Sequence, residues 1–326
     1  MKTLLIIFIL LNLPAAAQKL HVVHTDSSRI ESRLYPGGKE VKEIITGKNL
    51  VYYWFYRNNQ ARVTTTSTYT KTDRVIGITK EYDDDGRLLY SIDHDHGKWI
   101  VANVQIDPYY FLRQQMKAKT DLLIAAMYGY CFLTHNVIWN VRSSTICNEA
   151  ICGNWTDIFG QRPIKFTFRY DVKLDPEHVY PELIEFALDA QGNFITDDYE
   201  DVYGFEPLSI FPVKGFELVY RKALVTAQKA SKVRGSLSTG FLKWEKVKSP
   251  FLYTYGLYTG QFRFYVPIKT GVQRDLHPKG RSRVTEYYNV YSFNPWTGAF
   301  AGKQQMESVH EWEERSGFSS GLRPRR

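Results

Sequence analysis

The chain has 326 residues, 44% hydrophobic and 23% charged, which is enough for one large or two ordinary domains with real cores. Aromatic residues make up 15% and favour pleated sheets, and the modest numbers of Pro (13) and Gly (22) exclude a disordered chain. The formal net charge of +8 is compatible with an anionic partner, although simple solubility explains it as well.

The N-terminus carries the pattern of a secretory signal peptide. Lys2 gives a positive start, residues 4–11 form an unbroken apolar run, and small residues follow Pro14 up to Ala17. The run is short for a bilayer span, and polar chain begins at once with Gln18. We therefore predict cleavage between Ala17 and Gln18, a periplasmic or secreted product, and no transmembrane segment after signal removal. Outside the cytoplasm we expect no nucleic-acid partner.

Residues 19–104 alternate between strand and turn patterns. Residues 50–56 are apolar on both faces, which predicts a central, well-covered strand. Residues 62–69 are β-branched and more polar, which predicts a strand with one solvated face. Residues 83–86 (Asp-Asp-Asp-Gly) predict a turn, because Asp and Gly supply the local hydrogen bonds and positive φ that turns need.

Two of the turns share a sequence unit. Residues 35–41 (Tyr-Pro-Gly-Gly-Lys-Glu-Val) and residues 82–89 (Tyr-Asp-Asp-Asp-Gly-Arg-Leu-Leu) each place an aromatic residue shortly before Gly and a basic residue. This unit resembles the MORN-like antitoxin-component repeats, and the resemblance covers roughly residues 29–100. It implies stacked β-hairpins of a kind common in exported bacterial proteins.

The most site-like run is Asp93-His94-Asp95-His96. In a strand, the two Asp would share one face and the two His the other. Such a His pair can bind a transition metal such as zinc, and the carboxylates can hold calcium. The acid spacing of a calcium loop is absent, so a solvated hairpin end is the competing interpretation. We keep these four residues as a candidate calcium or zinc site and predict no other cofactor.

Residues 108–135 have helical spacing. Pro108 can stand in the first turn of one helix, and Thr120-Asp121 can cap a second helix over residues 122–127. The apolar run over residues 122–139 contains polar residues that a membrane span tolerates poorly, so we predict a core helix followed by a core strand.

The chain contains three cysteines, Cys131, Cys147 and Cys152. Four residues separate Cys147 from Cys152, a spacing that a small loop can close, and export makes the bond chemically possible. No Cys-x-x-Cys motif and no second pair for a zinc site is present. We predict a Cys147–Cys152 disulfide and a buried free thiol at Cys131.

The C-terminal part reads as a helix from about Gly215, strands over residues 251–258, 261–268 and 285–293, and a turn at residues 294–298 (Asn-Pro-Trp-Thr-Gly). This order resembles the PepSY domain, a small α+β module of exported bacterial proteins. Asn294 stands where the family usually has Asp. The resemblance implies a non-catalytic regulatory or inhibitory module.

No catalytic motif stands out, since Gly-x-Ser-x-Gly, His-Glu-x-x-His and phosphate-loop patterns are absent. We interpret the acidic residues 197–201 as solvated surface and most aromatic residues as core. A sugar-binding platform is the alternative, and its candidate rings are Trp54, Trp99, Tyr253, Tyr255, Tyr258, Phe262, Phe264, Tyr287, Tyr291 and Trp296.

We therefore expect an α+β protein of mainly antiparallel hairpins with a few helices and a C-terminal helix-on-sheet module. The expected parts are a signal peptide (1–17), a hairpin-rich β domain with one or two helices (18–212), a PepSY-like module (213–310) and a polar tail (311–326). The favoured function is an exported, non-enzymatic binding or regulatory protein that acts on an envelope protein partner. A glycan-binding or glycan-processing envelope protein and a divalent-metal-binding envelope protein remain as alternatives.

Overall fold

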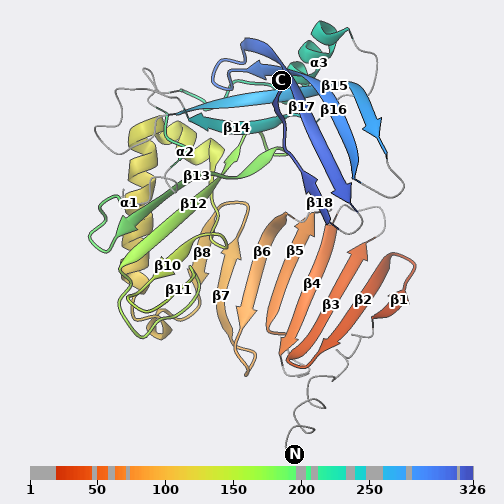
Figure 1. The fold of residues 1–326 in the computed structure, drawn as a ribbon. Helices are drawn as coiled ribbons and strands as arrows, with labels where there is room; N and C mark the ends of the chain where they lie inside the picture. Colours follow the sequence, from red (N-terminus) through yellow and green to blue (C-terminus); the bar gives the residue numbers. More distant parts are fainter. Residues whose placement is uncertain are drawn as a thin grey trace, which may run out of the picture. The chain divides into compact units, whose positions relative to one another are not determined.

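The computed structural model describes residues 20–45, 50–57, 63–70, 74–195, 203–206, 212–232, 239–246, 260–276, 281–313 and 316–325. Over these ranges the protein is an α+β fold made mainly of antiparallel sheet with three α-helices, which confirms the predicted class (Figure 1). The chain divides into two compact units, Met1–Pro108 and Tyr109–Arg326. The predicted signal peptide and its cleavage point lie outside the described residues.

The first unit is an antiparallel meander in which each strand pairs with the next along the chain. Tyr35 pairs with Gly38 across the β2–β3 turn, and residues 83–87 join β6 to β7, so both predicted turn units lie at hairpin ends. The strands are β1 (His21–His24), β2 (Ser28–Tyr35), β3 (Gly38–Ile45), β4 (Leu50–Arg57), β5 (Thr65–Thr70), β6 (Val75–Tyr82), β7 (Leu88–Asp93) and β8 (Lys98–Val101).

Strand β4 lies inside the sheet as predicted, but it is less covered than its sequence suggests. Val51 is buried, whereas Tyr52, Trp54 and Tyr56 are half-buried and Phe55 is exposed. The described part of this unit contains only strands and a short 3₁₀ turn at Val104–Ile106, so no helix of its own packs on the sheet. Both faces of β4 therefore carry aromatic side chains that solvent reaches.

The second unit begins with helices α1 (Tyr110–Tyr128) and α2 (Tyr130–Asn136). The helices part at Gly129, whose φ of 85° is costly for other residues, and not at Thr120 as predicted. Thr120 is buried inside α1, where its hydroxyl contacts the carbonyl of Lys117 at 2.7 Å and the Tyr170 hydroxyl. Core packing thus uses the side chain that we expected to cap a helix.

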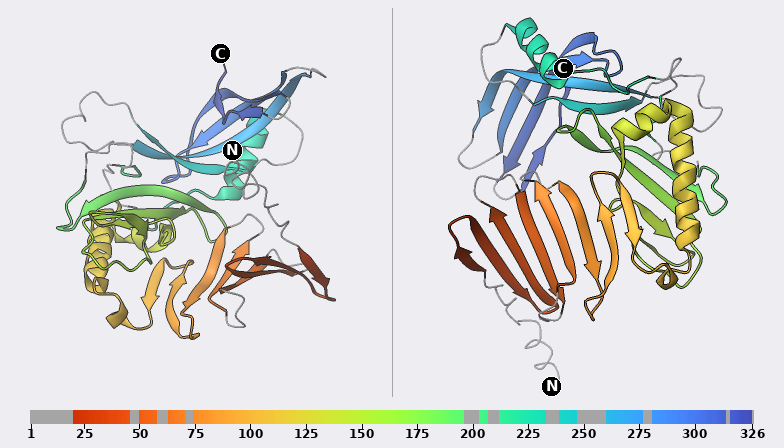
Figure 2. Two further views of the ribbon diagram at one scale, coloured as in Figure 1. Left: turned by 60° about the horizontal axis from the view of Figure 1, so that its bottom comes forward. Right: turned by 180° about the vertical axis from the view of Figure 1, so that it is seen from behind.

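A second antiparallel sheet packs against these helices (Figure 2). Its strand order is β11-β10-β12-β13, with β9 also paired to β12. Its core is aromatic, and the rings of Trp155, Phe166, Phe168 and Phe186 are fully buried. The strands are β9 (Val137–Trp139), β10 (Thr145–Cys147), β11 (Cys152–Asn154), β12 (Lys165–Lys173) and β13 (Val179–Asp189).

A third antiparallel sheet, ordered β14-β15-β16-β17-β18 with β19 paired to β17, carries helix α3. The helix buries Ala223, Leu224 and Ala227 and contacts β15 and β16, which confirms the helix-on-sheet module. The bounds are α3 (Tyr220–Ser231), β14 (Phe241–Lys246), β15 (Gly260–Asp275), β16 (Ser282–Phe293), β17 (Phe300–Glu313), β18 (Ser316–Ser319) and β19 (Arg323–Pro324).

Two sequence-based expectations concern the end of the chain and residues 251–258. Much of the predicted polar tail at residues 311–326 pairs with the sheet as the end of β17, β18 and β19. Two of its charged residues form ion pairs there, Glu311 with Arg281 and Arg283, and Arg323 with Glu307. The predicted strand at residues 251–258 lies outside the described residues.

Contacts between rings join helices α1 and α2 to the third sheet, for example between Tyr128 and Phe262 on β15. Trp296 lies 4.5 Å from Phe216, 4.9 Å from Phe132 and 5.7 Å from Tyr128, measured between ring centroids. This cluster explains why the chain divides by contacts at Pro108 and not near residue 212. The predicted boundary between residues 212 and 213 stays a prediction. None of the helices in the described ranges has the length and hydrophobicity needed to cross a bilayer.

Candidate functional site

The predicted metal residues lie at the end of β7. The strand stops at Asp93 and residues 94–97 form a turn, so the four side chains do not alternate across a strand. Asp93 accepts hydrogen bonds from the backbone N–H of Asp95 and of His96, both at 3.1 Å, and its Oδ2 lies 2.8 Å from Nδ1 of His96. These contacts cap the turn in the usual manner of an Asp side chain.

The other two residues of the run point to different partners. Nε2 of His94 lies 2.8 Å from the Thr79 hydroxyl, and Asp95 accepts a hydrogen bond from the backbone N–H of Gly77 at 3.1 Å. Among the described residues, no three His, Cys, Asp or Glu side chains gather closely enough to share a metal ion. The structure thus brings the side chains of Asp93 and His96 together, and the metal site stays a prediction.

The charge of Asp93 follows from the same turn. Partial burial acts to raise the pKa of Asp93, but the hydrogen bonds from the side chain and backbone of His96 outweigh it and hold the pKa below its usual value. The turn therefore favours the ionised carboxylate, which agrees with a structural role for Asp93.

The predicted disulfide is confirmed. Cys147 and Cys152 lie opposite each other on β10 and β11, and their sulfur atoms are bonded. The Asn148 side chain accepts hydrogen bonds from the backbone N–H of Ala150 and Ile151 at 2.9 Å, which closes the turn between them. Cys131, predicted to be buried, is a half-buried free thiol on α2.

Two carboxylates of the second unit are withdrawn from solvent, and sequence patterns did not single them out. Glu185 is buried, where it binds Arg169 at 2.8 Å and accepts a hydrogen bond from the Tyr203 hydroxyl at 2.9 Å. Glu206 accepts hydrogen bonds from the Trp296 indole at 2.8 Å and from the backbone of Phe262 at 3.1 Å. Both groups are held by partners, which favours structural roles over acid–base chemistry.

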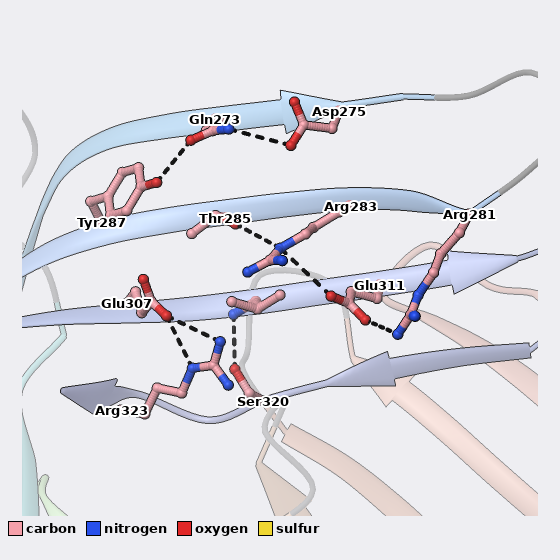
Figure 3. A network of polar contacts seen from close by, with 11 residues as sticks. Gln273, Asp275, Arg281, Arg283, Thr285, Tyr287, Glu307, Glu311, Ser320 and Arg323 are labelled. Carbon is pink, nitrogen blue, oxygen red and sulfur yellow. Dashed lines mark hydrogen bonds and ion pairs between the residues drawn. The ribbon is translucent and has the colours of Figure 1, made fainter. Parts of the chain in front are cut away.

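Charged side chains also form a network on strands β16, β17 and β19 of the third sheet (Figure 3). Glu311 pairs with Arg281 and with Arg283, and Glu307 pairs with Arg323 at 3.0 Å. The arginine is the more exposed member of each pair, for example 67% for the Arg281 side chain against 17% for Glu311. The ion pairs join the start of β16 and strand β19 to β17, and the arginine side chains face solvent.

The most distinctive surface lies on β4. Tyr52, Trp54 and Tyr56 alternate along the strand, so they share one face of the first sheet, and all three are half-buried. The rings of Tyr52 and Trp54 have centroids 6.3 Å apart and planes only 26° apart. We call Tyr52, Trp54 and Tyr56 the aromatic row.

Polar side chains flank the aromatic row on both sides. On β5, Thr68 lies opposite Tyr52 and Thr66 opposite Trp54. On β3, Glu43 lies opposite Tyr52 and Lys39 opposite Tyr56, and the Lys39 ammonium lies 5.7 Å from the centroid of the Tyr56 ring. The row is therefore bordered by hydroxyl groups on the β5 side; on the β3 side Val41 lies opposite Trp54, between one positive and one negative charge.

The opposite face of β4 differs in character. Tyr53 and Phe55 lie there with ring centroids 6.1 Å apart, and the Lys42 ammonium lies 5.6 Å from the Tyr53 ring. A small pocket of about 60 Å³ on this face is lined by Tyr53 and four charged side chains, Glu31, Arg33, Glu40 and Lys42. Four charged side chains surround Tyr53 on this face, whereas the aromatic row has threonine hydroxyls on one side.

The rings proposed for a sugar-binding platform differ in their burial. Trp99, Phe262, Phe264 and Tyr291 are buried, which removes them as stacking surfaces. Trp296 is half-buried within the ring cluster of the second unit, and Tyr287 lies under the guanidinium of Arg325 at 4.6 Å. The platform predicted at residues 253, 255 and 258 lies outside the described residues.

Of the proposed rings, Trp54 belongs to the aromatic row, whereas its neighbours Tyr52 and Tyr56 were missed. Alternation along residues 50–56 was the signal that could have found them. Comparisons of the chain with protein-family models, with curated proteins and with solved structures find no match. The function must therefore be inferred from the residues and their geometry.

Proposed function

We propose that this chain is an exported, non-enzymatic binding protein that uses the aromatic row as its binding surface. The supporting observation is a line of three half-buried rings inside a sheet on which no helix of its own unit packs, within the described residues. Aromatic rings carry a large share of binding energy when a ligand displaces water from them. If no ligand bound these rings, the folded chain would be more stable with the rings covered by its own residues.

Export is supported by two observations of different kinds. Residues 1–17 have the charge, apolar run and small residues of a signal peptide. The Cys147–Cys152 bond is of a type that persists in oxidising compartments such as the periplasm or the extracellular space. The resemblances to MORN-like repeats and to the PepSY domain agree with this address, and the second supports a regulatory role towards an envelope protein.

A non-catalytic role is supported by the contacts of the withdrawn carboxylates. Glu185 and Glu206 are engaged by structural donors, and Asp93 caps its own turn. The metal-binding alternative gains no support from the geometry, because His94 and Asp95 contact other groups. The glycan alternative gains support from the aromatic row and is developed below.

Two measurements test the proposal. Mass spectrometry of the protein from its source cells should find a mature chain that begins at Gln18, in an extracytoplasmic fraction. The immobilised mature chain should then retain cell-envelope material from the same cells, and Trp54→Ala should weaken this retention while Phe55→Ala, on the opposite face of β4, should not. A chain that keeps Met1 inside the cell, or equal retention by both variants, would overturn the proposal.

A further inference from the structure

We infer that the ligand of the aromatic row is a glycan, a chain of neutral pyranose sugars that lies along β4. This inference rests on the proposed function and specifies the partner of the same surface. It depends on three features of the described residues: the repeat of the rings, the free hydroxyls beside them, and the balance of charge around them.

The rings repeat in the way that a polymer repeats. Alternate residues of a strand lie about 7 Å apart on one face, and Tyr52 and Trp54 follow this spacing with centroids 6.3 Å apart. Their planes differ by 26°, so these two rings present similar orientations. A glycan offers successive sugar rings, each with an apolar C–H face that packs on the negative face of an aromatic ring.

Hydroxyl groups stand beside the rings where a sugar needs hydrogen-bond partners. Thr66 and Thr68 lie opposite Trp54 and Tyr52 in the strand register. Both are half-buried, and within the described ranges neither hydroxyl makes a side-chain hydrogen bond, in contrast to Thr65, which binds Glu81 at 2.6 Å. Each threonine hydroxyl can donate one hydrogen bond and accept two, as sugar hydroxyls do.

The charges around the row favour a neutral ligand. Lys39 and Glu43 border the same side of the row and carry opposite signs, and the Lys39 ammonium already lies over the Tyr56 ring. A strongly anionic polymer would be attracted by one end of this border and repelled by the other. The arginine-rich end of the third sheet is the more suitable place for an anion, and it plays no part in this inference.

The test is isothermal calorimetry of the full mature chain with neutral oligosaccharides: malto-, cello-, xylo- and chito-oligomers of increasing length. We expect one class to bind, with affinity that rises with length until the row is filled. Trp54→Ala should lower the affinity about tenfold or more, by analogy with the loss of one base-stacking aromatic side chain in proteins that bind single-stranded nucleic acids. Phe55→Ala is the matched control, because it removes an aromatic ring from the other face of the same strand, and its affinity should equal that of the wild type.

Thr68→Val keeps the shape of the side chain and removes its hydroxyl, so it tests the ligand even if Trp54→Ala is poorly folded. We expect a severalfold loss of affinity with an unchanged melting temperature. Equal affinities of wild type and Thr68→Val, or no binding to any oligomer, would overturn the inference that the ligand is a glycan. Retention of an envelope protein that still depends on Trp54 would then leave the proposed function standing with a protein partner, whereas loss of that retention as well would remove both.

Discussion

The indole N–H of Trp296 donates a hydrogen bond to Oε2 of Glu206 across 2.8 Å, although the two residues lie far apart in the chain. The contact joins the turn before β17 to the segment that follows β13. The same carboxylate accepts a hydrogen bond from the backbone of Phe262 on β15, so one side chain connects three segments of the second unit. Burial raises the pKa of Glu206, and the hydrogen bonds from Trp296 and Phe262 reduce that shift without cancelling it.

We expect Glu206→Gln to stabilise the protein more at neutral pH than at acidic pH. Because the pKa of Glu206 is higher in the folded state than in the unfolded state, folding favours its protonated form. The stability that this group contributes is present below the unfolded pKa and is lost as the pH rises through the folded pKa. Glutamine keeps an acceptor oxygen for Trp296 and has no such loss.

Thermal unfolding of wild type and Glu206→Gln at several pH values from about 4 to about 7 measures this difference, because a glutamate side chain in an unfolded chain titrates at the lower end of that range. The advantage of the glutamine variant in melting temperature should grow with pH. An advantage that shrinks as the pH rises would contradict the raised pKa of Glu206.

Gly204 should tolerate a side chain much less well than Gly77. Both have positive φ, 87° and 63°, but a Cβ on Gly204 would lie 2.4 Å from the carbonyl oxygen of Leu183, whereas a Cβ on Gly77 would meet nothing within 4 Å. Gly204 also presents its carbonyl to the buried Tyr128 hydroxyl at 2.5 Å. Gly77→Ala should cost about 1–2 kcal/mol of backbone strain, and Gly204→Ala clearly more, as measured by chemical denaturation. Equal costs would show that the Gly204 contact relaxes freely.

Reduction of the disulfide should lower the stability of the protein only modestly. The bond joins residues only five positions apart in the sequence, so the chain-entropy account assigns it about 2 kcal/mol of stability. The double variant Cys147→Ser/Cys152→Ser should unfold at slightly lower denaturant concentration and keep its fold. Alkylation of the unfolded wild type should label one cysteine before reduction and three after it, because Cys131 is the free thiol.

The ion pair of Glu185 and the ion pairs of Glu311 should contribute different amounts to the free energy of unfolding. The side chain of Glu185, which binds Arg169, is only 7% exposed, whereas the arginines that bind Glu311 are exposed. Removing one partner of a fully buried pair costs about 3 kcal/mol or more. The Arg169 side chain is 29% exposed, so the cost here should be lower, yet above the value of about 0–1 kcal/mol for an exposed pair. We therefore expect Glu185→Gln to destabilise the protein well beyond Glu311→Gln, and the small effect of Glu311→Gln to fade in high salt. Similar losses for the two variants would contradict the burial of Glu185.

Local patterns predicted a large part of the fold. The turns at residues 83–86 and 294–298 lie between strands, because Asp, Asn and Gly form these turns through their own hydrogen bonds and φ angles. The Cys147–Cys152 bond followed from the spacing of the two cysteines together with the export pattern. The predicted break between the two helices was wrong. Thr120 is a residue type that often caps helices, but here its hydroxyl contacts the buried Tyr170 hydroxyl inside α1.

The candidate surface was predictable only in part. Trp54 was singled out as one of ten rings, and composition could not separate it from Phe262 or Tyr291, which are buried. A sequence shows which face of a strand a ring occupies but not whether another layer covers that face. Sheet stacking decides the exposure, and it depends on contacts between segments far apart in the chain.

The sequence by itself determined the pieces: an export pattern, alternating strands, their turns and one short disulfide loop, because each depends on residues that are close along the chain. Only the tertiary structure decided that Trp296 meets Glu206, that the last residues complete a sheet, and that the aromatic row is left half-buried on its strand. These relationships depend on which surfaces remain uncovered when distant segments pack, and that is a property of the whole chain.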